Sequence, residues 1–153
     1  MGDLERIAYE SALRALDKQE KVLEELRART GILLGASSLA VSLLAATALD
    51  DSRPVALVLL ALAAFVVSLG ASLFVVLPRE GFVFSLNGPE IYEELYGFSD
   101  DIAEVHRRLA YDQQRFWEEN DNRLAPVRQA FRIAAYALAA EVFALLLLAS
   151  DTL

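Results

Sequence analysis

The sequence predicts an all-α integral membrane protein with three transmembrane helices. Two uncharged apolar runs, residues 31–49 and 54–77, are each long enough to cross the roughly 30 Å hydrocarbon core of a bilayer as a helix. A third span, assigned to residues 130–150, is also apolar but contains the acidic residue Glu141. The chain is 56% hydrophobic, above the roughly 45–50% of soluble proteins. The expected order is an N-terminal helix, a hairpin of two spans, a helical segment and a third span.

Lysine and arginine are distributed unevenly over the segments that flank these spans. Residues 1–30 contain six of them, the connection 50–53 contains one, residues 79–128 contain six and the tail 151–153 contains none. Under the positive-inside rule, the basic segments stay in the cytoplasm. We therefore expect a cell-membrane protein whose N-terminus and residues 79–128 are cytoplasmic. The 50–53 turn and the C-terminal tail are then outside.

The composition and motifs exclude several classes of function. The chain has no cysteine, so disulfides and CxxC sites are absent from it. It contains no dinucleotide-binding glycine pattern, Walker loop, HExxH or GxSxG motif. His106 is the single histidine, with no second histidine or cysteine to share a metal. The net charge of −8 argues against nucleic acid as a partner. We expect neither an enzyme nor a resident cofactor or metal.

Residues 1–30 are predicted to form a charged helix with a heptad pattern. Residues at alternating spacings of three and four make up its seam: Tyr9, Ala12, Leu16, Gln19, Leu23, Leu26 and Thr30. Such a seam is typical of a coiled coil between protomers, in which a buried polar residue fixes the register. The oligomer contacts would then include Leu16, Gln19, Leu23 and Leu26. The alternative is that the same face packs on the chain's own second cytoplasmic helix.

The second cytoplasmic region, residues 79–128, is predicted to begin with a turn and continue as helix. A turn at Asn87 precedes a short helix at 90–96, and Ser99 is expected to cap a longer helix from about residue 100 to 123. Pro126 marks a break or a new helix start before the third span.

Glu141 lies about eight residues into the apolar part of the third span, roughly 12 Å deep at 1.5 Å per residue. An acidic residue at that depth costs roughly 2.5–3.5 kcal/mol on insertion scales, so it usually faces other helices or water. Hydroxyl groups at matching depths belong to Ser38, Ser42 and Ser68. One interpretation is that Glu141 forms hydrogen bonds that hold the spans or several protomers together. The other is that it lines a pore or exchanges protons.

Gly31 and Gly35 form a GxxxG pattern at the start of the first span. Small residues four apart let transmembrane helices approach closely. Together with the heptad seam and the intramembrane carboxyl group, the pattern favours a homo-oligomer.

The layout resembles a known family. The stretches that carry the likeness are LRARTGILLGASSLAVSLLAA (26–46), GFVFS (81–85), YEEL (92–95) and NDNRLAPVRQAFRIA (120–134). They are similar in arrangement to the Pycsar-effector transmembrane (PycTM) family and its SLATT relatives. The resemblance implies an effector of bacterial antiphage defence. A nucleotide cyclase or another sensor would produce a signal, and the protein would then assemble and disrupt the inner membrane.

If that signal is a cyclic nucleotide, charge alone makes four cytoplasmic residues its candidate ligands: Arg107, Arg108, Arg115 and Arg123. The alternative is that these arginines pair with Glu118, Glu119 and Asp121. Two other functions stay open. One is a small membrane scaffold that anchors a cytoplasmic partner, and the other is a proton-conducting ring around Glu141.

Overall fold

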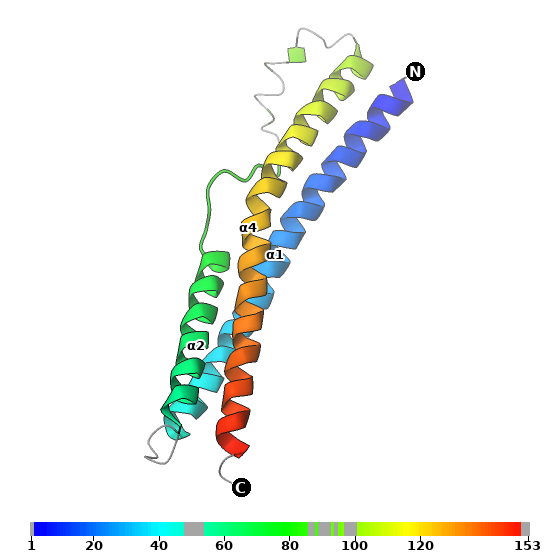
Figure 1. Cartoon of the computed structure of the whole chain (residues 1–153). Helices are drawn as coiled ribbons and strands as arrows, with labels where there is room; N and C mark the ends of the chain where they lie inside the picture. Colours follow the sequence, from blue (N-terminus) through cyan, green and yellow to red (C-terminus); the bar gives the residue numbers. More distant parts are fainter. Residues whose placement is uncertain are drawn as a thin grey trace. The chain divides into compact units, whose positions relative to one another are not determined.

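The computed structural model describes residues 2–47, 54–85, 88, 93, 95–96 and 101–150. Its helices are α1 (Gly2–Thr47), α2 (Val55–Val76) and α4 (Ile102–Ser150) (Figure 1). All three are long and apolar enough to cross a membrane. The predicted all-α class with three candidate spans is confirmed.

The chain forms two compact units. The first unit consists of residues 1–24 and 79–125, and the second consists of residues 25–78 and 126–153. Helices α1 and α4 contribute to both units, whereas α2 belongs to the second.

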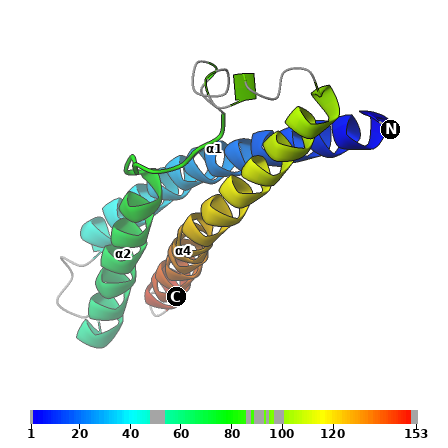
Figure 2. The same ribbon diagram turned by 90° about the horizontal axis from the view of Figure 1, so that it is seen from above.

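In the first unit, α1 and α4 lie side by side (Figures 1 and 2). Polar and aromatic side chains make contacts between them. Leu16 is 1% exposed, and the Gln19 side chain donates a hydrogen bond from Nε2 to the Trp117 carbonyl at 2.9 Å. The Tyr9 ring stacks on His106 with 5.4 Å between centroids. The heptad face of this unit therefore packs on the chain's own α4. A coiled coil between protomers remains a prediction.

A short extended segment after α2, residues 81–85, is fastened to α4 in the first unit; we call it the strap. Asn120 accepts a hydrogen bond from the Val83 amide at 3.1 Å and donates one to the Val83 carbonyl at 2.8 Å. Gly81 has a φ of 92°, and the Arg123 guanidinium occupies the space that a Cβ at Gly81 would need. Phe82 stacks on Phe84 at 5.5 Å. Glycine is required in the strap by its conformation and by this contact.

The start of α4 differs from the prediction. The helix begins at Ile102, and the Asp101 carboxylate accepts hydrogen bonds from the amides of Ala103 and Glu104 at 3.1 and 3.2 Å. Asp101 is therefore the capping residue. The predicted cap at Ser99, the turn at Asn87 and most of the short helix at 90–96 lie outside the described residues.

The predicted break at Pro126 was wrong, because Pro126 lies inside the continuous helix α4. A proline removes one backbone hydrogen bond and crowds the carbonyl four residues earlier. Here that carbonyl belongs to the exposed residue Asn122. The neighbours Leu124 and Val127 are each 1% exposed, so burial on both sides of the proline offsets its cost.

The second unit is a three-helix bundle. Ser68 of α2 bonds to Ala134 of α4, and Ala61 of α2 clusters with Ala144, so these helices run antiparallel. Ser37 of α1 bonds to Glu141 of α4, and further along both helices Leu44 and Leu148 belong to one cluster. Helices α1 and α4 are therefore parallel.

The strap generates a prediction about stability. Asn120→Ala should lower the stability of the first unit by about 1–3 kcal/mol, because both polar groups of Val83 lose their partner. The measurement is thermal unfolding of the detergent-purified protein, followed by the fluorescence of its single tryptophan, Trp117. Asn122→Ala, at an exposed position of the same helix, is the matched control and should leave the midpoint unchanged. Equal midpoints for the two variants would contradict this role of Asn120.

Candidate functional site

Glu141, the acidic residue of the third candidate span, is enclosed by its own protomer. Glu141 is 0% exposed in the second unit, and the Ser37 hydroxyl donates a hydrogen bond to its Oε2 at 2.6 Å. The other carboxyl oxygen, Oε1, is buried and has no hydrogen-bond partner among the described residues. Ser37 is itself 1% exposed. The site therefore holds an acidic group against a neutral donor, inside the bundle and away from its exposed surface.

The predicted serine partners of Glu141 were wrong. Ser38 and Ser42 are exposed, and their hydroxyls donate to carbonyls of their own helix at 2.8 and 2.7 Å. Ser68 is buried, but its hydroxyl donates to the Ala134 carbonyl at 3.3 Å. Ser37 was missed in the sequence, although a signal for it existed. The heptad of the N-terminal helix continues into the span, with buried positions seven apart at Leu16, Leu23, Thr30, Ser37 and Leu44.

An apolar cluster follows Glu141 along the bundle, and we call it the apolar layer. It consists of Leu44, Ala61, Ala144 and Leu148, each at most 4% exposed. Val41, Leu57, Val58 and Leu145 pack against it. Glu141 thus lies about one helical turn from an entirely apolar segment of the core, which begins on α4 at Ala144.

Gly31 and Gly35 face outward from the second unit. Both are exposed, and nothing in the described residues lies within 4 Å of where a Cβ would project from either. Ser38 and Ser42 continue the same exposed face of α1. The GxxxG pattern therefore packs against no other described helix of the protomer. Its role in an oligomer stays a prediction.

The four candidate arginines of the first unit do not converge on one site. Arg107 and Arg108 both bind Glu104, at 2.7 and 3.0 Å. The Arg115 guanidinium lies 4.0 Å from Asp112 and over the Phe116 ring. Arg123 lies against the strap.

The ion pairs that the structure shows for these arginines use Glu104 and Asp112, whereas a pairing with Glu119 or Asp121 stays a prediction. Glu104 and Asp112 precede their arginines by three or four residues on α4, the spacing that brings helical side chains together. Glu118 instead accepts a hydrogen bond from Gln114 at 3.0 Å. Hydrogen bonds from Arg108 and Arg107 hold the pKa of Glu104 below its ordinary value.

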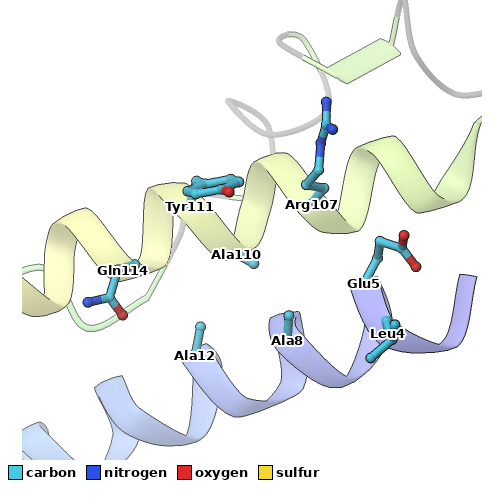
Figure 3. Close-up of a pocket in the computed structure, with 8 residues that line it drawn as sticks. All are labelled: Leu4, Glu5, Ala8, Ala12, Arg107, Ala110, Tyr111 and Gln114. Carbon is cyan, nitrogen blue, oxygen red and sulfur yellow. The ribbon is translucent and has the colours of Figure 1, made fainter.

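A hollow of about 470 Å³ lies between α1 and α4 in the first unit (Figure 3). Its lining consists of Leu4, Glu5, Ala8, Ala12, Arg107, Ala110, Tyr111 and Gln114. Ala8, Ala12 and Ala110 have small side chains, and the hollow occupies space that larger side chains at these positions would fill. An oxygen of Glu5, Oε2, is buried here and has no hydrogen-bond partner in the part of the chain that the structure describes.

A second hollow of about 400 Å³ adjoins the first, and Arg107 and Tyr111 line both. These volumes fall within the roughly 300–1,000 Å³ of small-molecule sites. Arg107 and Tyr111 are therefore the residues that the two hollows share, and we call this pair the ridge.

No family model, curated protein or solved structure matches the chain. The resemblance to the PycTM and SLATT proteins therefore stays a prediction that rests on the four stretches named for it. Within the described residues, no cluster of three or more histidine or acidic side chains is placed to hold a metal ion.

The Ser37–Glu141 hydrogen bond should appear as a coupling energy. In a double-mutant cycle of Ser37→Ala and Glu141→Leu, we expect about 0.6–1.7 kcal/mol of coupling, the range for hydrogen bonds between membrane helices. Unfolding in mixed micelles, followed by circular dichroism, measures it. The matched cycle of Ser38→Ala with Glu141→Leu should be additive, because Ser38 bonds to its own helix. Additivity in both cycles would exclude the pairing.

The Glu104 ion pairs should make a small, pH-dependent contribution to stability. Because the pKa of Glu104 is lower in the folded protein, its contribution is present above the ordinary value of 4.5 and is lost as the pH falls through the folded value. Glu104→Gln should therefore lower the unfolding temperature at pH 7 and low salt, and the difference from wild type should disappear in acid. Glu119→Gln, an exposed change on the same helix, is the control. A difference that persists in strong acid would contradict this electrostatic origin.

Proposed function

We propose that the chain is a signal-gated effector that permeabilises the cell membrane in bacterial antiphage defence. The observation that carries the proposal is the fully buried Glu141, which is bonded to a neutral side chain inside a unit of candidate membrane spans. Acidic residues in spans are costly and mark ion or proton pathways. The family resemblance supports the assignment to defence. It adds the expectation that the protein stays closed until a signal arrives.

The proposed topology places the N-terminus in the cytoplasm and the C-terminus outside, with three spans. The distribution of lysine and arginine supports it, since residues 1–30 and 79–128 carry nearly all of them. The first unit, residues 1–24 and 79–125, contains most of these two segments. It is therefore the cytoplasmic part in this proposal, and the second unit is the membrane part.

The signal in this proposal binds at the ridge of Arg107 and Tyr111. A small anion with a planar ring, such as a cyclic nucleotide, suits it, because the ring can stack on Tyr111 and the phosphate can meet guanidinium groups. Arg107 and Arg108 share one carboxylate, Glu104, so this trio by itself carries one net positive charge, and the carboxylates of Glu5 and Asp112 line the hollows beside it. The two hollows provide room beside it.

Assembly in this proposal uses the exposed face of α1 in the second unit. Gly31, Gly35, Ser38 and Ser42 lie on that face and would let a second copy approach closely. Glu141 points into its own bundle instead of onto this face. Its position weighs against a proton-conducting ring in which the carboxyl groups of several protomers meet at a shared axis.

The second candidate function is a membrane scaffold that docks a cytoplasmic partner. Exposed apolar side chains of the first unit favour it: Leu4 is 76% exposed, Ile7 55% and Tyr111 73%. A partner that covered these residues would fill the hollow beside them. In this case the spans serve as an anchor.

The test of the effector is membrane potential in bacteria that express the chain, measured with a voltage-sensitive dye. Wild type should depolarise the cells only with a co-expressed nucleotide cyclase. Glu141→Gln and Glu141→Leu should change the rate several-fold, because they alter the polar centre of the bundle. Val142→Leu, at a neighbouring exposed position, is the matched control and should behave as wild type.

Two outcomes decide between the candidate functions. Signal-dependent depolarisation supports the effector, and dependence on Glu141 places the carboxyl group in or near the pathway. No depolarisation under any signal, together with co-purification of one partner in a fixed ratio, would replace the effector with the scaffold.

A further inference from the structure

The buried groups of the second unit follow an order along the bundle axis. The Ser68 hydroxyl bonds to the carbonyl of Ala134 on α4, and the Ser37 hydroxyl bonds to Glu141 seven residues further along the same helix. Leu148, another seven residues along α4, belongs to the apolar layer. At 1.5 Å per residue, α4 rises about 10 Å from Ala134 to Glu141 and about 10 Å more to Leu148. The buried hydroxyls of Ser68 and Ser72 therefore lie on one side of Glu141, among buried apolar residues such as Val75 and Ala134, and the apolar layer lies on the other side.

Two buried polar atoms of this region are bonded to none of the described residues. They are the Glu141 Oε1 and the Ser72 hydroxyl, and both side chains are 0% exposed. Buried polar groups in proteins are nearly always bonded, and where no protein group is in reach the partner is water. Ser72 lies one helical turn beyond Ser68, away from the apolar layer.

The apolar layer cannot hold water in the same way. Its side chains offer no hydrogen bonds, Ala61 and Ala144 are 0% exposed, and Leu44 and Leu148 are at most 4% exposed. A narrow apolar constriction stops conduction by excluding water, and it conducts once it widens and wets.

We propose that Leu44, Ala61, Ala144 and Leu148 form the closed gate of a proton path that runs inside one protomer and passes through Glu141. This inference deepens the proposed effector function and rests on it. A proton arrives along water beside Ser72 and Ser68 and joins the Glu141 carboxylate. When the two leucines separate and water enters, the proton leaves to the opposite side and the carboxylate is restored. With the proposed topology, the gate is at the outer end of the path.

The chemistry of the site favours a proton over a metal cation. Glu141 and Ser37 supply only two carboxyl oxygens and one hydroxyl, fewer than the six or so oxygen ligands that hard cations require. Ser37 of α1 is the described side chain that bonds to the carboxyl group. In residues 31–49, 54–77 and 133–150, Glu141 is the single charged residue.

The experiment uses the full chain in lipid vesicles with a trapped pH-sensitive dye, and a potassium gradient with valinomycin drives proton uptake. Without any signal, Leu44→Ser and Leu148→Ser should take up protons at least several-fold faster than wild type. Leu43→Ser and Leu147→Ser make the same chemical change at exposed neighbouring positions. Vesicles with these variants should take up protons no faster than wild type. Adding Glu141→Leu to Leu148→Ser should abolish the extra flux. Trapped carboxyfluorescein should be retained throughout.

A gentler pair of variants guards against misfolding. Ala61→Ser adds one hydroxyl to the gate without removing volume, and Ala63→Ser makes the same change at an exposed position of α2. Circular dichroism checks the helix content of each. If Ala61→Ser is folded and its vesicles take up protons no faster than those of Ala63→Ser, the proposed gate is contradicted. Equal leakage from gate and control variants, or loss of the large dye, would also overturn it.

These outcomes are distinct from failure of the effector function. If wild type depolarises cells on signal while folded gate variants stay tight in vesicles, the function stands and the path lies elsewhere, as between protomers. If gate variants leak protons while wild type never responds to a signal in cells, the gate is supported and the signal-gated function fails.

Discussion

The structure of the second unit depends on one constraint, namely that an acidic side chain in an apolar span must face another helix. Glu141 meets this constraint by accepting a hydrogen bond from the Ser37 hydroxyl at 2.6 Å, and its side chain is 0% exposed. That contact fixes the rotation of α1 and α4 about their axes, because each residue turns a helix by about 100°. Once Ser37 faces inward, Leu44 also faces inward seven residues later. Ser38 and the two glycines then face outward.

The first unit uses buried amides for the same purpose. Gln19 holds the Trp117 carbonyl, and Asn120 holds both polar groups of Val83. Leucine packing alone tolerates small shifts along a helix pair, whereas an amide that must meet a specific backbone group specifies one register. The strap joins the end of α2 to this helix pair through Asn120 and Arg123. Within the proposed function, the strap is a direct covalent route by which a change in the first unit reaches a membrane span.

The fold class could be predicted from the sequence, because uncharged apolar runs of about 20 residues are typical of membrane-spanning helices. Glu141 could be identified for the same reason, as a charge in a span. Its partner could not be chosen by depth alone, since Ser37 and Ser38 have nearly equal depth and differ by about 100° in direction. Extending the heptad would have separated them. The break predicted at Pro126 was wrong because burial of the neighbouring residues overrides the local preference of proline. Glu104 and Asp112 could have been found as arginine partners from their helical spacing of three or four residues.

The account depends most directly on Glu141 pointing at Ser37 within one protomer, and the absence of cysteine from the chain makes this measurable in native membranes. The double variant Ser37→Cys/Glu141→Cys would be treated with a short bifunctional thiol reagent, with a protease site inserted between residues 86 and 90. After cleavage, the account predicts that the two fragments stay joined within one chain. The Ser38→Cys/Glu141→Cys pair should separate. Crosslinks that instead join two chains, or that form equally from Ser38→Cys, would contradict the account, because Glu141 would then face a neighbouring protomer.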